Sequence, residues 1–164
     1  MSSGILDIYK MKRLRIYLDT SVYGGCFDSE FREFTEPLFK RIFDGEFVIL
    51  FSTMLDEELK FAPEPIQLLV SKVVDSYMEF LEDKEEAVDL ATEYIEEKVV
   101  GSTSLADCLH IALATIYQAD LLVSWNFKHI VNIERIRGYN SINIKNGYKQ
   151  LEIRSPRDIM SYEN

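Results

Sequence analysis

Two short, uninterrupted apolar runs constrain the fold of this chain most strongly. They are EFVILFS at residues 46–52 and LLVS at 121–124, and both are flanked by segments with helical spacing of apolar residues. Strands that are apolar on both faces are typical of a parallel sheet covered by helices on both sides. RLRIYLD at 13–19 alternates apolar and polar residues and adds another strand. The sequence therefore predicts an α/β fold with a central parallel β-sheet.

Helical patterns occupy the segments between these strands. Residues 31–45 space their apolar side chains at helical intervals and end at a glycine. Thr53 is expected to cap the next helix, at 53–62, with Asp56 completing a capping box. A chain of 164 residues suits one domain, so we expect a single domain over 1–164 with its core at about 14–154. The remaining expected elements are helices at 66–81, 85–99 and 101–120, a strand at 148–154, and a short helix at 155–160 capped by Ser155.

The acidic residues are unevenly distributed along the chain. The net charge of −10 argues at first sight against a nucleic-acid partner. However, residues 47–120 hold 4 basic and 16 acidic side chains, whereas residues 121–164 hold 7 basic and 4 acidic ones. Most of the acids suit solvated helix faces. An anionic substrate is therefore expected to approach from the C-terminal third.

The sequence favours a cytoplasmic protein with no membrane segment. No apolar stretch approaches the roughly 20 residues that a membrane helix needs. The N-terminal residues lack the long apolar region and the small-residue cleavage site of a signal peptide. Cys26 and Cys108 match no metal or redox spacing, which suits free thiols in a reducing compartment.

Three acids are expected near one edge of the sheet. Asp19 closes the first strand, and the carboxyl ends of parallel strands form the usual site of such folds. Glu58 lies on the apolar side of its helix, unlike Glu57, and a carboxylate there is costly unless it is paired or binds a metal. Asp107 lies in the first turn of the most apolar helix. Structural alternatives stay open for all three: a helix cap for Asp19, an acid at the margin of an apolar face for Glu58, and a capping box with Ser104 for Asp107.

Oxygen-only ligands of this kind suit Mg²⁺ or Mn²⁺ rather than zinc. Such ions commonly serve phosphodiester chemistry, in which they activate water and neutralise charge on the leaving oxygen. The sequence does not favour other kinds of catalytic site. It has only two histidines, too few and too badly spaced for a zincin, and it has no Walker loop, GxGxxG motif or nucleophile elbow.

The chain resembles the PIN domain, the nuclease fold of VapC-like toxins in type II toxin–antitoxin pairs and of some RNA-processing factors. The matching segments, in order, are IYLDTSVYGG, STMLDEELKFAP, LADCLHIALA and ADLLVSWNFKHI. The resemblance implies a PIN-like metal-dependent endoribonuclease in which Asp19, Glu58 and Asp107 bind Mg²⁺ or Mn²⁺ and are catalytic. It also implies an RNA substrate, an antitoxin protein as partner and a homodimer.

The fourth segment departs from the family pattern. The family commonly has Thr-x-Asp here, whereas this chain has Ser124-Trp125-Asn126. Asn126 keeps an acceptor oxygen but has no negative charge, so we expect it to orient water or substrate, or simply to cap the next turn. Thr20, Ser124 and Lys128 are candidate substrate contacts, although Lys128 and His129 also suit an exposed surface. The amide favours an alternative function: a catalytically weak or inactive PIN-like module that binds nucleic acid or protein.

Overall fold

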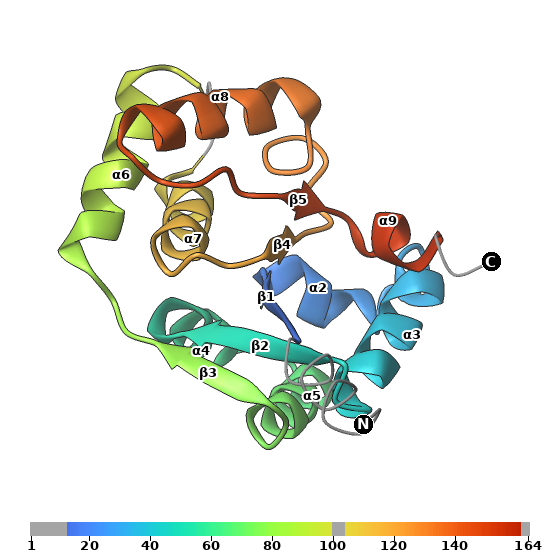
Figure 1. Cartoon of the computed structure of the whole chain (residues 1–164). Helices are drawn as coiled ribbons and strands as arrows, with labels where there is room; N and C mark the ends of the chain where they lie inside the picture. The colour runs from blue at the N-terminus through green and yellow to red at the C-terminus, as the bar shows by residue number, and fades with distance from the viewer. Residues whose placement is uncertain (1–12, 100–103, 162–164) are drawn as a thin grey trace, which may run out of the picture.

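The computed structural model describes residues 13–99 and 104–161, and its centre is one parallel sheet. The strands lie in the order β3-β2-β1-β4-β5, as Figure 1 shows, and every neighbouring pair is parallel. Their bounds are β1 Leu14–Leu18, β2 Phe47–Ser52, β3 Met78–Leu81, β4 Leu121–Val123 and β5 Ile153–Arg154. The order of the strands places β1 at the centre, between β2 and β4.

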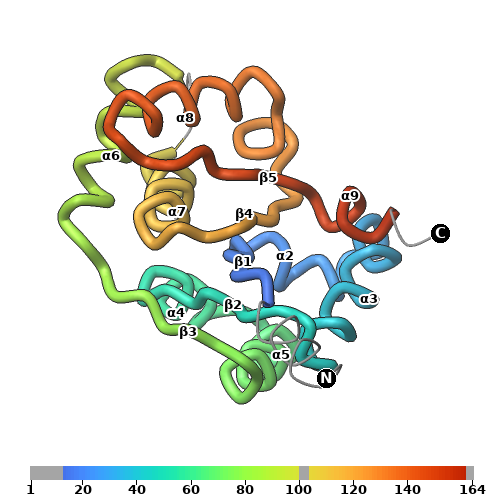
Figure 2. The backbone as a smooth tube through the Cα atoms, viewed as in Figure 1, coloured from blue at the N-terminus to red at the C-terminus, as the bar shows by residue number. Residues whose placement is uncertain are grey.

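Helices cover both faces of this sheet. In Figures 1 and 2, α6, α7 and α8 gather on one side, and α2, α3, α5 and α9 on the other. Helix α4 follows β2 directly and packs on it. The helix bounds are α2 Thr20–Gly25, α3 Arg32–Phe43, α4 Thr53–Leu59, α5 Glu64–Val74, α6 Glu85–Glu96, α7 Leu105–Ile116, α8 Ile133–Lys145 and α9 Pro156–Met160. This is the α/β architecture that the apolar runs predict.

The expected helix at 66–81 and the expected cap at Thr53 are partly wrong. The expected helix at 66–81 ends at Val74, and Met78–Leu81 forms the edge strand β3 instead. The reason is tertiary, because the register pairs Ile49 with Met78 and Ser52 with Leu81, so these residues gain ladder partners on β2. The helix after β2 is capped by Ser52, which accepts from Leu55 N at 3.1 Å, and not by Thr53. The first residues of the expected helix at 101–120 lie outside the described part of the chain.

The expected strand at 148–154 is shortened to Ile153–Arg154. Before it, the backbone of Leu151 is paired with Asn140 of α8. Its side-chain oxygen accepts from Leu151 N at 2.7 Å, and its amide nitrogen donates to Leu151 O at 3.0 Å. Both backbone groups of Leu151 are therefore satisfied by a side chain without a neighbouring strand.

The core is formed by the strands and by the inner faces of the helices. Ile16, Leu50, Leu122 and Ile111 are fully buried, so β1, β2, β4 and α7 pack without access to water. Ser155 caps α9 in a capping box with Asp158, as the sequence predicts. Within the described residues, no helix is long and apolar enough to span a bilayer.

Candidate functional site

Asp19 lies at the carboxyl end of the central strand, directly before α2. It is 5% exposed, and its carboxylate accepts hydrogen bonds from Ser21 N at 3.1 Å, from the Ser21 hydroxyl, and from Ser124 Oγ at 2.6 Å. Burial raises the pKa of Asp19, and the negative charge of Asp107 raises it further, against the lowering effect of the two serines and His110. Asp19 thus caps α2 and also lies at the carboxyl edge of the sheet, where the functional site is expected.

Glu58 projects from α4 toward the same edge, and its side chain is 31% exposed. His110 Nε2 lies 3.1 Å from Oε1 and 3.0 Å from Oε2, and the Thr20 hydroxyl donates to Oε2. Burial alone would raise the pKa of Glu58, but the hydrogen bond and charge of His110 and the bond from Thr20 outweigh it and lower that pKa. Glu57 is exposed as well, but its side chain has no hydrogen bond or ion pair to the described residues of this site.

Asp107 lies in the first turn of α7, where its backbone N–H donates to the capping Ser104 hydroxyl at 3.2 Å. Its side chain is partly exposed, and its charge is close enough to act on the pKa of Asp19. Within residues 13–99 and 104–161, no three His, Cys, Asp or Glu side chains converge on one metal position as they stand. The donor chemistry nevertheless fits a hard cation, because all three groups are carboxylates and a positive ion would offset the effects that raise the pKa of Asp19.

The segment after β4 connects to Asp19 through serine hydroxyls. Ser124 Oγ donates to Asp19 and accepts from Asn126 N at 2.9 Å, while Trp125 N donates to Ser21 Oγ at 2.9 Å. The side-chain oxygen of Asn126 accepts from His129 N at 3.0 Å, which is the capping geometry. Its amide nitrogen has no hydrogen-bond partner within the described part of the chain, so this donor is available to a ligand.

The other candidate contacts divide into two kinds. Thr20 and Ser124 each hydrogen-bond directly to one carboxylate, Thr20 to Glu58 and Ser124 to Asp19. Lys128 is exposed and has no described ion-pair partner, which agrees with a surface lysine and leaves a phosphate contact open.

A tight contact behind the site makes Gly25 the first test of the local packing. A Cβ at Gly25 would lie 2.7 Å from Thr35 Oγ1 and 2.8 Å from Trp125 Nε1, two atoms that share a hydrogen bond of 2.9 Å. We expect Gly25→Ala to lower the free energy of unfolding by about 1–3 kcal/mol through overpacking. Chemical denaturation measures this.

Gly24 provides the matched control, since a Cβ there meets only Ile66 Cδ1, at 4.0 Å. Gly24→Ala should be neutral or stabilising by up to about 1 kcal/mol, as expected within a helix. Equal stability of the two variants would contradict the packing of Trp125 against Gly25.

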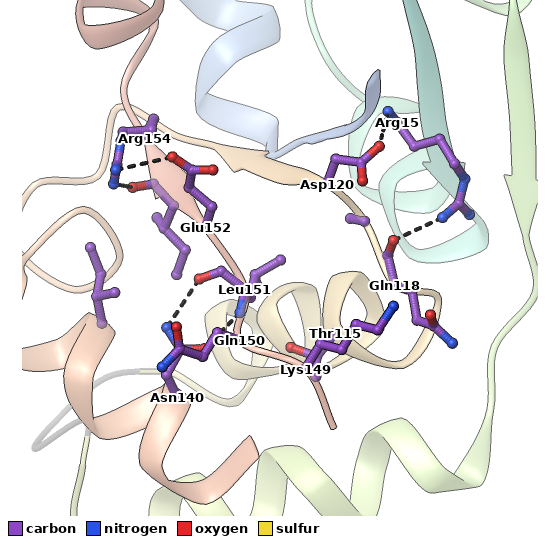
Figure 3. A pocket seen from close by; sticks show the side chains of 13 residues that line it. Arg15, Thr115, Gln118, Asp120, Asn140, Lys149, Gln150, Leu151, Glu152 and Arg154 are labelled. Atoms are coloured by element: carbon purple, nitrogen blue, oxygen red, sulfur yellow. Dashed lines mark hydrogen bonds and ion pairs between the residues drawn. The ribbon is translucent and has the colours of Figure 1, made fainter. Parts of the chain in front are cut away.

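A cavity of about 630 Å³ lies at the opposite edge of the sheet, near the amino ends of β1, β4 and β5. Figure 3 shows its polar groups bonded to one another: Asp120 accepts from Arg15 N at 2.7 Å, and Arg154 pairs with Glu152 at 3.0 Å. The Arg15 guanidinium is satisfied by Glu79 and by the carbonyls of Tyr117 and Gln118, directly after α7. This cavity is therefore separate from the carboxylates.

Comparison with known proteins identifies the fold. No family model matches the chain, and no curated protein matches it either. A chain of VapBC2 from Rickettsia felis, bound to a DNA fragment from their promoter, superimposes with a TM-score of 0.53 over 87% of this chain and 98% of that chain, at 15% identity. A chain of FitAcB from Neisseria gonorrhoeae superimposes with a TM-score of 0.54 over 86% of this chain and 97% of that chain, at 10% sequence identity. The chain has the PIN-like fold. A chain of FitAB bound to IR36 DNA also superimposes, with 0.54 over 86% and 94%, at 12% identity.

The PIN-like sheet also brings together residues to which the sequence analysis assigns no role in the site. Tyr17, Ser52 and Ser21 all bond to groups of the site, yet each is an ordinary strand or helix-cap residue in the sequence. His110 gives a weak sequence signal, since it shares a helical side with Asp107. The partners of a buried hydroxyl depend on the neighbouring strand, which local patterns do not specify.

Proposed function

We propose that this PIN-like chain is a metal-dependent endoribonuclease, of the kind that forms the toxin of a toxin–antitoxin pair, and that it hydrolyses RNA phosphodiesters. One observation carries the proposal: Asp19 follows β1, Glu58 lies on α4 directly after the neighbouring strand β2, and the hydroxyl of Thr20, the residue after Asp19, donates to Glu58. Asp107 lies in the first turn of α7, the helix whose His110 contacts the same Glu58 carboxylate. Clustered carboxylates at the carboxyl edge of a parallel sheet suit Mg²⁺ or Mn²⁺.

Asp19, Glu58 and Asp107 would hold the ion. When bound, the ion supplies Lewis-acid activation of water and neutralises charge on the leaving oxygen. The low pKa of Glu58 keeps its carboxylate ionised at neutral pH, and the serines around Asp19 hold that carboxylate in one orientation. The available amide nitrogen of Asn126 would donate to water or to a phosphate oxygen. Phe127, next in the chain and 49% exposed, offers a face on which a base can stack.

The direct test is cleavage of single-stranded RNA by the purified chain. We expect cleavage with Mn²⁺ or Mg²⁺, none with excess EDTA, and recovery when Mn²⁺ is added back. Cleavage that continues unchanged in EDTA would contradict the metal dependence, and cleavage of DNA alone would contradict the assignment of RNA as substrate.

A second candidate is a PIN-like module that binds nucleic acid or protein without catalysis. The neutral Asn126 favours it, and so does the pairing of Glu58 with His110. Calorimetric titration with Mn²⁺ separates the candidates, since a binding module needs no metal site.

We extend the proposal to a protein partner. The solved complexes VapBC2, FitAcB and FitAB contain chains with this fold. Helix α5 is apolar but has only Val73 buried, and it exposes Leu68 and Val74. An antitoxin-like protein would cover such a surface, and a second copy of the chain is the other occupant to distinguish. Co-expression with the neighbouring open reading frame, followed by co-purification, tests this.

A further inference from the structure

A chain of buried hydrogen bonds runs from the core to Glu58. Tyr17 of β1 is fully buried, and its hydroxyl lies 2.9 Å from Ser52 Oγ and 2.6 Å from His110 Nδ1. The other ring nitrogen of His110 contacts both oxygens of Glu58. Ser52 also caps α4, the helix that carries Glu58. The chain thus joins β1, β2, α4 and α7 at one carboxylate.

The directions of these hydrogen bonds follow from the acceptors. An ionised carboxylate only accepts, so the His110 Nε2–H must donate to Glu58. In the single-proton tautomer, Nδ1 then accepts from the Tyr17 hydroxyl, and the Tyr17 oxygen accepts from Ser52. The Ser52 oxygen remains free to accept from Leu55 N, as it does at 3.1 Å. Every donor in this series of hydrogen bonds, from Ser52 to Glu58, then has an acceptor.

We propose that His110, oriented by Tyr17 and Ser52, is a positioning residue that fixes the Glu58 carboxylate for metal binding. This inference rests on the proposed function. Neither His110 nor Tyr17 would contact the ion or the RNA, because both side chains are buried behind Glu58. Their effect is on orientation: Glu58 is partly exposed, and without a fixed donor its side chain would have to be ordered when the cation binds.

Outer-sphere hydrogen bonds of this kind typically change metal affinity by about 10- to 100-fold. Removing the donor should therefore weaken Mn²⁺ binding even though every proposed ligand is still present. If His110 instead competed with the cation for Glu58, the effect would be the opposite. Removing His110 would then free the Glu58 carboxylate and tighten Mn²⁺ binding. The sign of the change distinguishes positioning from competition.

The experiment measures Mn²⁺ affinity by calorimetry on the full chain without RNA. His110→Ala should weaken binding by about 10- to 100-fold. His110→Gln places an amide nitrogen where Nε2 lies and should restore most of the affinity. His110→Asn places its side-chain amide where Nδ1 lies, so the amide reaches Tyr17 but not Glu58. This variant should not restore the Mn²⁺ affinity. Unchanged or tighter binding in His110→Ala, or equal rescue by Gln and Asn, would overturn the positioning role.

Tyrosine variants separate positioning from loss of stability. Tyr17→Phe removes the hydroxyl that orients His110, and we expect a several-fold loss of Mn²⁺ affinity. Tyr94→Phe removes a comparable buried hydroxyl, bonded to Asn143 and remote from Glu58, and should lower the melting temperature without changing Mn²⁺ affinity. Parallel loss of affinity in both variants would show a merely structural effect and contradict the proposal.

The proposed function and this inference fail in different ways. A wild-type chain that binds no Mn²⁺ would overturn the proposed function and the positioning role together. A wild-type chain that binds Mn²⁺ and a His110→Ala variant that binds equally well would overturn only the positioning role. The imidazole ¹⁵N shifts give a readout independent of metal: we expect the proton on Nε2, and a proton on Nδ1 alone would contradict the orientation by Tyr17.

Discussion

Replacing Glu58 with Gln is expected to lower metal-dependent RNA cleavage by at least about 100-fold, because a direct ligand should matter no less than an outer-sphere partner. The substitution keeps the size of the side chain and one acceptor oxygen but removes the negative charge. The pKa of Glu58 is lowered in the folded protein, so the charge that is lost is one that the wild type carries throughout the neutral range. Mn²⁺ affinity should fall with the rate.

Glu57→Gln is the matched control, since it removes the same charge one residue away on the same helix, from a side chain that bonds to neither His110 nor Thr20. We expect cleavage within a few-fold of wild type for this variant. The comparison uses initial rates at saturating Mn²⁺, with circular dichroism to verify that both variants fold. If Glu57→Gln lost as much activity as Glu58→Gln, the effect would belong to the general charge of α4 and not to a ligand.

Asp19→Asn is expected to abolish cleavage and also to stabilise the metal-free protein at neutral pH. Asp19 is 5% exposed, and burial together with the charge of Asp107 raises its pKa above that of the unfolded chain. A group with a raised pKa in the folded state binds its proton more tightly there than in the unfolded state. Its ionisation therefore destabilises the fold, and the destabilisation is present above the raised pKa.

The stabilisation should depend on pH in a defined direction. Above the raised pKa, the wild type carries the buried charge and the amide variant does not, so the variant should melt at the higher temperature. As the pH falls through that pKa, the wild type takes up a proton and the difference should shrink. Melting curves in EDTA over a series of pH values measure this. A variant that is less stable than the wild type at neutral pH would show that the serine hydrogen bonds outweigh the cost of burial.

The sequence-based prediction was most accurate where structure is locally encoded. The runs at 46–52 and 121–124 became β2 and β4 because uninterrupted apolar residues can be buried on both faces only within a sheet. β3 was missed because Met78–Leu81 continues a helical spacing, and only its pairing with β2 makes it a strand. The cap at Ser52 in place of Thr53 is a shift of one residue, which depends on where the ladder ends.

The candidate site divides in the same way. Asp19 and Glu58 could be selected from the sequence because a carboxylate at a strand end or on an apolar helix face is costly unless something binds it. The roles of Tyr17 and Ser52 could not, since a tyrosine in an alternating strand and a serine before a helix are common. Their partners come from elements 35 and 93 residues away. Asn126 proved to be a cap as well as a neighbour of the site, so the two sequence interpretations are compatible.

The two hydrogen bonds between the Asn140 side chain and the Leu151 backbone have a consequence for aggregation in concentrated solution. The outermost strand of an open sheet presents unpaired backbone groups that can recruit another chain and start aggregation. Here the amide of Asn140 takes both the N–H and the C=O of Leu151, as an incoming strand would, just before β5 begins. Asn140 thus occupies the backbone groups of Leu151 beside the edge strand, and another chain cannot extend the sheet by pairing with this residue.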